Sequence, residues 1–284
     1  MDPLPNLIEL LVIAFPAGIL GAMTGIGGGI ILIPILTLIG VPIKYAIAAS
    51  LLSTIATSSG SASAYVRDRL SNIRIGMYLE MFTVVGAIVG ATIVVLLPSQ
   101  YTWILFFAFA AILLLSWWQL LTKKGHEELP FTYHQDKFSH WLGMDGIYYD
   151  KAERRWIYYK ARRASYGGAA MFGAGMIAGL LGIGAGAVKV TIHDLIMNMP
   201  GKVSTTTSNF IIGVTALSGV SVFLASGLVN LGLVAPIAIG VTTGAILGTK
   251  VLVKMKNLQV RKLFLVVLFV LAAEMILRGA GVLH

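Results

Sequence analysis

The stretch GIGGG at residues 25–29 decides the fold of this chain, because it lies in the middle of an apolar run that spans residues 6–39. Glycine in a helix interior is less favourable than alanine by roughly 1 kcal/mol per residue. A straight helix over the whole run would be about 51 Å long, whereas one membrane crossing needs about 30 Å. We therefore expect the run to break at the glycines and to return, either as two crossings or as a re-entrant hairpin.

A second stretch, GIGAG at residues 182–186, lies in the same way inside the apolar run 165–198. The similarity continues beyond it with one inserted residue, and the further matched pairs are Pro42 with Pro200, Lys44 with Lys202, Ser50 with Ser208, Asn72 with Asn230, Gly86 with Gly244 and Gly90 with Gly248. Collinear matches of this kind indicate an internal duplication, a common design among transporters.

Composition places the chain in a membrane. It has 284 residues, of which 57% are hydrophobic and 12% charged, whereas about 25% charged is usual for soluble domains. Eight apolar runs fall into two groups of four around a polar segment. We predict an all-α polytopic membrane protein of about 8–10 transmembrane helices, with a first repeat at 1–121, a linker at 122–164 and a second repeat at 165–284.

The basic residues predict the orientation. They concentrate in the segments 66–75, 122–164 and 250–262, which the positive-inside rule assigns to the cytoplasm. Segments 97–101 and 227–230 carry none and are expected outside. With a return at each glycine cluster, the halves have opposite orientation in the cytoplasmic membrane, which is an inverted-topology repeat. Both termini are then expected on the outer side of this membrane. Four crossings in one half would instead make the repeat parallel and violate the charge rule there.

Several chemistries are excluded or disfavoured. The absence of cysteine excludes disulfides and thiolate sites, and the N-terminus lacks the basic residues of a secretory signal. No zinc-protease spacing or Lys-Ser/Thr phosphate loop is present. We therefore expect no enzyme, no cofactor, no metal and no nucleic-acid partner.

The two helix breaks are the candidate substrate site. The first turn of a helix has unpaired N–H groups and a partial positive charge, so a half-helix that begins in the membrane can bind an anion. Small residues let the ligand approach the backbone, and those we expect to contact it are Gly27, Gly28, Gly29, Gly184, Ala185 and Gly186. Tight helix–helix packing is the alternative, and we favour it for Gly86, Gly90, Gly244 and Gly248.

Polar side chains near the breaks complete this prediction. Lys189 follows the second cluster in an apolar stretch, and an intramembrane charge is a functional candidate. Its alternative is a lysine that snorkels to the surface or pairs with Asp194. Hydroxyls and an amide are suitable donors to an oxyanion, and we select Ser50, Ser53, Thr54, Ser208 and Asn209. Many such hydroxyls bond only to their own helix.

Three acidic residues are candidates for carrying a coupling proton, namely Glu80, Asp194 and Glu274. Structural pairing is the alternative, for Glu80 with Arg74 or Arg67. His193 is expected to have a structural hydrogen bond.

The linker has its own pattern. Residues 146–150 and 156–160 are β-prone and aromatic, which predicts a small hairpin. Tyrosine and tryptophan beside lysine and arginine suit the lipid headgroup surface. A regulatory or partner-binding module is the alternative.

The glycine pattern resembles a known family. Gly18 and Gly21 before the first cluster, then Pro34 and Pro42, and the corresponding GMIAGLLGIGAG at 175–186, are similar to the sulfite exporter TauE/SafE family. The resemblance implies a permease for small sulfur-containing or organic anions such as sulfite, thiosulfate or sulfonates. Thr191 replaces Pro34, and Ala185 replaces Gly28, in the second repeat. We expect a secondary transporter that works by alternating access, with an anion channel or a membrane scaffold as alternatives; the oligomeric state stays open.

Overall fold

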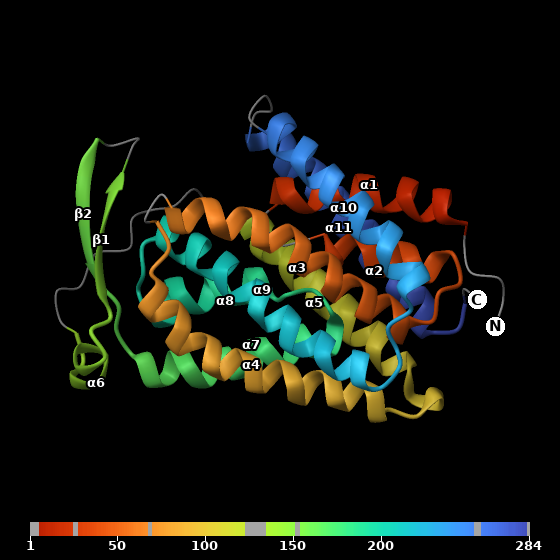
Figure 1. Ribbon diagram of the computed structural model, residues 1–284, viewed down its shortest axis with the longest axis horizontal. Helices are drawn as coiled ribbons and strands as arrows, with labels where there is room; N and C mark the ends of the chain where they lie inside the picture. The colour runs from red at the N-terminus through yellow and green to blue at the C-terminus, as the bar shows by residue number, and fades with distance from the viewer. Residues whose placement is uncertain are drawn as a thin grey trace.

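The computed structural model describes residues 6–24, 28–67, 70–122, 135–150, 154–252 and 257–282. It is an elongated helical bundle with a small hairpin at one end (Figure 1). The helices of the first half are α1 Leu7–Thr24, α2 Gly29–Leu38, α3 Ile43–Arg67, α4 Ile73–Leu96, the 3-10 turn η1 Ser99–Tyr101 and α5 Trp103–Thr122. Those of the second half are α7 Ala164–Leu181, α8 Gly186–Thr191, the π-helix η2 Ile192–Ile196, α9 Gly201–Ala225, α10 Leu231–Leu252 and α11 Asn257–Gly279.

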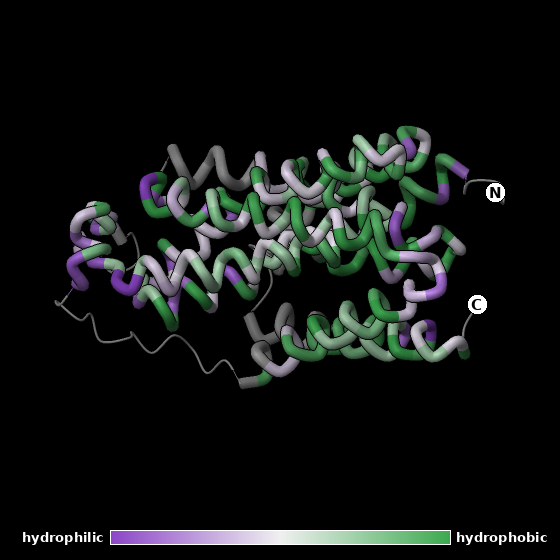
Figure 2. The backbone as a smooth tube through the Cα atoms, turned by 90° about the horizontal axis from the view of Figure 1, so that it is seen from below, coloured by the Kyte–Doolittle hydropathy of each residue, from purple (hydrophilic) through white to green (hydrophobic). Residues whose placement is uncertain are grey.

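The bundle has the surface of a membrane protein. Within the described residues, four helical segments are long and apolar enough to cross a bilayer, namely Ile73–Leu96, Ser99–Trp118, Ala164–Leu181 and Gly201–Ala225. Large apolar side chains such as Met81 and Leu224 point outward from them. Hydrophilic residues gather toward the two ends of the bundle and at the hairpin (Figure 2). The predicted all-α polytopic fold is confirmed.

Helices of one half pack against helices of the other. α1 packs along α10 and α4 along α7, while α3 packs against α9 and α5 against α11. If each helix is replaced by its counterpart in the other half, the pair α1–α10 becomes α7–α4. The pairs α3–α9 and α5–α11 each become themselves. This is the pairing that an internal two-fold relation between the halves produces.

α3 and α9 run antiparallel. Leu51, early in α3, contacts Gly219, late in α9, whereas Ser58 further along α3 contacts Gly213. Beyond the end of α3, the carbonyl oxygen of Leu70 accepts a hydrogen bond of 2.9 Å from Thr206.

Glycines allow two of these helix pairs to approach closely. A Cβ at Gly86 or Gly90 of α4 would overlap the carbonyl oxygens of Phe172 and Met176 in α7, and one at Gly244 would overlap the carbonyl of Phe15 in α1. The packing interpretation is confirmed for Gly86, Gly90 and Gly244. The surroundings of Gly248 lie outside the part described.

We expect Gly86→Leu to prevent correct assembly, because the new side chain would collide with backbone atoms rather than with a movable side chain. Size-exclusion chromatography of the purified protein should show aggregation or loss of the main peak. Gly173→Ala in α7 is the control, since a Cβ there meets nothing within 4 Å. A folded, monodisperse Gly86→Leu protein would contradict this packing.

The linker contains the predicted hairpin. β1 (Asp145–Asp150) and β2 (Arg155–Lys160) pair antiparallel after a short helix α6 (Lys137–Trp141). Asn72, which caps α4, donates a hydrogen bond of 2.8 Å to the hydroxyl of Tyr159 and one of 3.2 Å to the carbonyl oxygen of Asp145. Burial raises the pKa of Tyr159 to about 12, so its hydroxyl stays protonated at neutral pH. The hairpin is thus attached to the start of α4.

The hairpin lies at one end of the bundle, and the first and last described residues lie at the other (Figure 1). The residues that precede α4 lie beside the hairpin, whereas the carbonyl oxygens of Val95 and Leu97 bind the ammonium of Lys44 at the other end of α4, at 3.2 and 2.6 Å. The start of α1 and the end of α11 lie at the end opposite the hairpin (Figure 1).

Candidate anion site at the two helix breaks

The first glycine cluster separates two helices. α1 ends at Thr24, and α2 begins at Gly29 with Gly28 as its N-cap. Gly28 and Gly29 are buried, and Gly28, being a glycine, has no side chain that could cap the helix. Gly27 lies outside the described residues. The α2 N-terminus therefore presents backbone N–H groups in a buried position without a capping side chain.

The second cluster also breaks its helix, as predicted. α7 ends at Leu181 and is capped by Gly182, whose φ is +68°, and Gly184 follows with φ +67°. Ala185 has φ +52° although it carries a Cβ, and Gly186 begins α8. A left-handed non-glycine residue costs of order 1–3 kcal/mol, so the surrounding structure holds this turn in place.

The two breaks meet at Ser50 of α3. The Ser50 hydroxyl donates a 2.7 Å hydrogen bond to the carbonyl of Gly182. Gly29 of the first break lies at the same place, because a Cβ on it would overlap the Ser50 hydroxyl and would lie 2.9 Å from the Gly182 carbonyl oxygen. Thr54 lies one turn further along, next to both Gly29 and Gly184. Residues from both halves thus form one small buried region, which we call the break junction: Gly28, Gly29, Ser50, Thr54, Gly182 and Gly184.

The other selected polar residues divide into two groups. Ser53 and Thr54 donate to the carbonyl of Ser50 within their own helix. Ser208 donates to the carbonyl of Gly186, at 3.4 Å, and so lies at the second break. Asn209 is half-buried and donates a hydrogen bond of 3.2 Å to the carbonyl oxygen of Thr205 in its own helix. Of the selected donors, Ser50 makes a close hydrogen bond to the opposite half.

Lys189 lies in the interior, and its side chain is 0% exposed. Its ammonium donates 2.8 Å to the hydroxyl of Thr215, which is 3.2 Å from the hydroxyl of Thr83. The ammonium therefore bonds to a hydroxyl of α9, whereas the alternatives expected from the sequence were a side chain that reaches the surface or pairs with Asp194. Thr83 and Thr215 were absent from our sequence selection. Thr215 could have been found as the repeat counterpart of Thr57.

The acidic candidates lie in different surroundings. Glu80 is half-buried in α4, and its Oε1 is buried with no hydrogen-bond partner among the described residues. It is close enough to Lys189 for their charges to interact. Arg74, its expected partner, donates instead to the carbonyl of Gly143, and the side chain of Arg67 is outside the described part. Glu274 forms a 2.9 Å ion pair with Arg278 on α11.

His193 and Asp194 lie in η2. The Nδ1 of His193 is 3.1 Å from the carbonyl of Ser204, in agreement with a structural hydrogen bond. No group of three or more metal-binding side chains occurs in the described part of the chain.

These features define a multi-pass integral membrane protein whose two halves meet at broken helices. The chain belongs to the sulfite exporter TauE/SafE family, whose model matches residues 10–275. It is also 27% identical over 282 residues to the "Probable membrane transporter protein YunE" of Bacillus subtilis (strain 168). The aligned region covers 96% of this chain and 98% of that protein. No solved structure matches it significantly. The chain is thus a member of a family of membrane transporters.

Proposed function

We propose that this protein is a secondary transporter of a small anion such as sulfite, thiosulfate or a sulfonate. The observation that carries the proposal is the junction of the two breaks, where Gly29 of the first break and Gly182 of the second lie next to each other at the Ser50 hydroxyl. Irregular backbone deep in a membrane is tolerated where it is buried or lines a path. Here it comes from both halves at one place, which is the arrangement of a transport site.

The chemistry of the junction favours an anion. A helix N-terminus has a partial charge of about +0.5, and α2 begins at Gly29 with no capping side chain. Lys189 provides a full positive charge one turn into α8. In our proposal the anion accepts hydrogen bonds from the N–H groups of Gly28, Gly29 and Gly186, and from the Ser50 hydroxyl, which turns from the Gly182 carbonyl to the anion on binding. A site made mainly of backbone dipoles can bind the anion without holding it too tightly to release.

The proposal includes an inverted-topology repeat across the cytoplasmic membrane. It is supported by α3 and α9, which correspond in the two halves and run antiparallel where they cross. Equivalent helices of a parallel repeat would point in the same direction. We place the hairpin in the cytoplasm, and the start of α1 and the end of α11 outside.

Alternating access follows from the packing in this proposal. The close pairs α1–α10 and α4–α7, each joined by glycine contacts, act as rigid units on two sides of the junction. Rocking of one unit against the other exposes the junction first to one side of the membrane and then to the other.

Counterflow of radiolabelled sulfite into proteoliposomes tests this function. Vesicles loaded with unlabelled sulfite should take up the label transiently, above the level of protein-free liposomes, and unlabelled thiosulfate and sulfonates should compete. Saturable uptake that depends on the internal anion is expected of a carrier. Uptake that does not saturate and does not require internal anion, together with a measurable conductance, would indicate a channel and contradict the proposal.

A further inference from the structure

Two buried groups of opposite charge lie next to the proposed anion path, one from each half of the chain. Lys189 of α8 is fully buried, and Glu80 of α4 has a buried Oε1 with no hydrogen-bond partner in the described residues. Their charges interact, but the ammonium of Lys189 donates its hydrogen bond to the hydroxyl of Thr215, and Oε1 of Glu80 receives none from the described residues. The carboxyl group thus has a free acceptor beside a cation.

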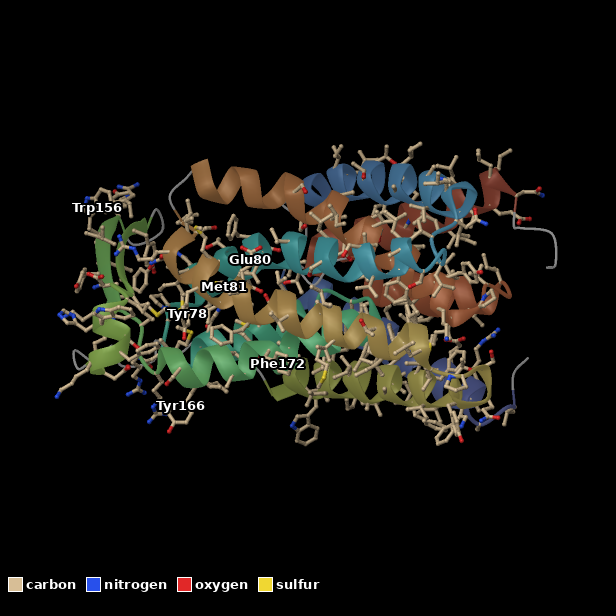
Figure 3. The ribbon with its side chains drawn as sticks, turned by 60° about the horizontal axis from the view of Figure 1, so that its bottom comes forward. Tyr78, Glu80, Met81, Trp156, Tyr166 and Phe172 are labelled. Atoms are coloured by element: carbon tan, nitrogen blue, oxygen red, sulfur yellow. The ribbon has the colours of Figure 1, made fainter. Side chains whose placement is uncertain are left out.

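The helical position of Glu80 directs it inward. It belongs to the stripe Gly76, Glu80 and Thr83 of α4, in which Gly76 contacts Phe210 of α9 and Thr83 lies against Thr215. Glu80 lies about two turns into α4, well within the bundle, whereas Trp156 marks the hairpin at its end (Figure 3). One of its two carboxylate oxygens, Oε1, is shielded from bulk water.

Other titratable groups near this pair are few. α7 contributes only Tyr166, which is exposed, and α9 contributes only Lys202 in its first turn. From η2 come His193, which is 0% exposed and whose Nε2 has no hydrogen-bond partner in the described part, and Asp194. Lys189 is the cation whose charge acts on both Glu80 and His193.

Electroneutrality links an anion to a proton at this place. Ionised Glu80 and Lys189 together have no net charge. A bound anion adds a negative charge in a low-dielectric interior, where an uncompensated charge costs several kcal/mol. A proton on Glu80 cancels one unit of negative charge, so anion binding and proton binding favour each other, and by linkage the effect is reciprocal.

We propose that Glu80 carries one proton across the membrane with each anion, while Lys189 stays charged as the counter-ion of the substrate. The proton binds a carboxylate oxygen of Glu80 from water on one side and returns to water on the other side when the anion leaves. This inference rests on the proposed transport function. It selects Glu80 rather than Glu274, which is already paired with Arg278.

The test compares counterflow with accumulation driven by a pH gradient in the same proteoliposomes. Labelled sulfite and labelled thiosulfate are the probes, the latter because its charge does not change near neutral pH. The membrane voltage is held at zero with potassium and valinomycin, and protein-free liposomes give the background. For the wild type we expect accumulation toward the alkaline side, up to about tenfold per pH unit for one proton per anion.

Glu80→Gln should retain counterflow, because glutamine imitates the protonated carboxyl group, but should lose accumulation driven by the gradient. Glu274→Gln is the matched control and should behave as the wild type. Wild-type counterflow without gradient-driven accumulation would overturn the coupling and leave the transport function standing. Undiminished accumulation by Glu80→Gln would place the proton elsewhere, and a folded Glu80→Gln protein without counterflow would also contradict the proposal. Absence of wild-type counterflow with both probes would refute the transport function itself.

Discussion

Gly29→Ala is expected to reduce sulfite counterflow to the level of protein-free liposomes. The added Cβ would overlap the Ser50 hydroxyl and lie 2.9 Å from the carbonyl oxygen of Gly182, so the Ser50 side chain must rotate and either α2 or the Gly182 turn must shift. The same methyl group would cover the first N–H groups of α2, which the proposed anion needs. Initial counterflow rates of the purified variant measure this effect.

The control for this experiment is Gly173→Ala, which adds the same methyl group in α7 where nothing lies within 4 Å. It should transport as the wild type does. Both variants should elute from size exclusion as the wild type does, so that a loss of transport is separated from misfolding. A folded Gly29→Ala protein that transports at the wild-type rate would remove the break junction from the anion path.

Lys189→Met is expected to weaken sulfite affinity by about 10- to 100-fold. A hydrogen bond to a charged group contributes roughly 1.5–3 kcal/mol, and each 1.4 kcal/mol is about a factor of ten in affinity. Methionine keeps most of the buried volume, so folding should be retained, as we also expect for Lys189→Ala. The concentration dependence of counterflow, or competition by unlabelled sulfite, measures the change.

Lys44→Met is the matched control. Lys44 binds the carbonyls of Val95 and Leu97 at the opposite end of α4 from the hairpin, away from the breaks. Its replacement should lower thermal stability and leave sulfite affinity unaltered. If Lys189→Met bound sulfite as tightly as the wild type, Lys189 would not belong to the site.

Much of the fold could be predicted because glycine has a strong local effect. The clusters at 25–29 and 182–186 predicted both helix breaks, and the β-prone residues of the linker predicted β1 and β2. These signals depend on a few neighbouring residues. The apolar runs likewise required only the length of a membrane crossing.

The contacts within the site could not be predicted in the same way. Ser50 and Gly182 are 132 residues apart, and nothing in the sequence near Ser50 indicates that its hydroxyl bonds to the opposite half rather than to its own helix, as Ser53 does. The partner of Lys189 is Thr215, because α8 packs against α9. Such pairs depend on how the halves pack, which a periodic pattern does not contain.

The location of a bound anion tests the central claim most directly. Selenite has the shape and charge of sulfite, and its selenium can be located by anomalous diffraction from crystals grown with it. We predict one strong peak at the break junction, within hydrogen-bond distance of Gly29 and Ser50 and on the side of Lys189. A peak at another place in the membrane region, from protein that shows selenite-competed sulfite counterflow, would contradict the account.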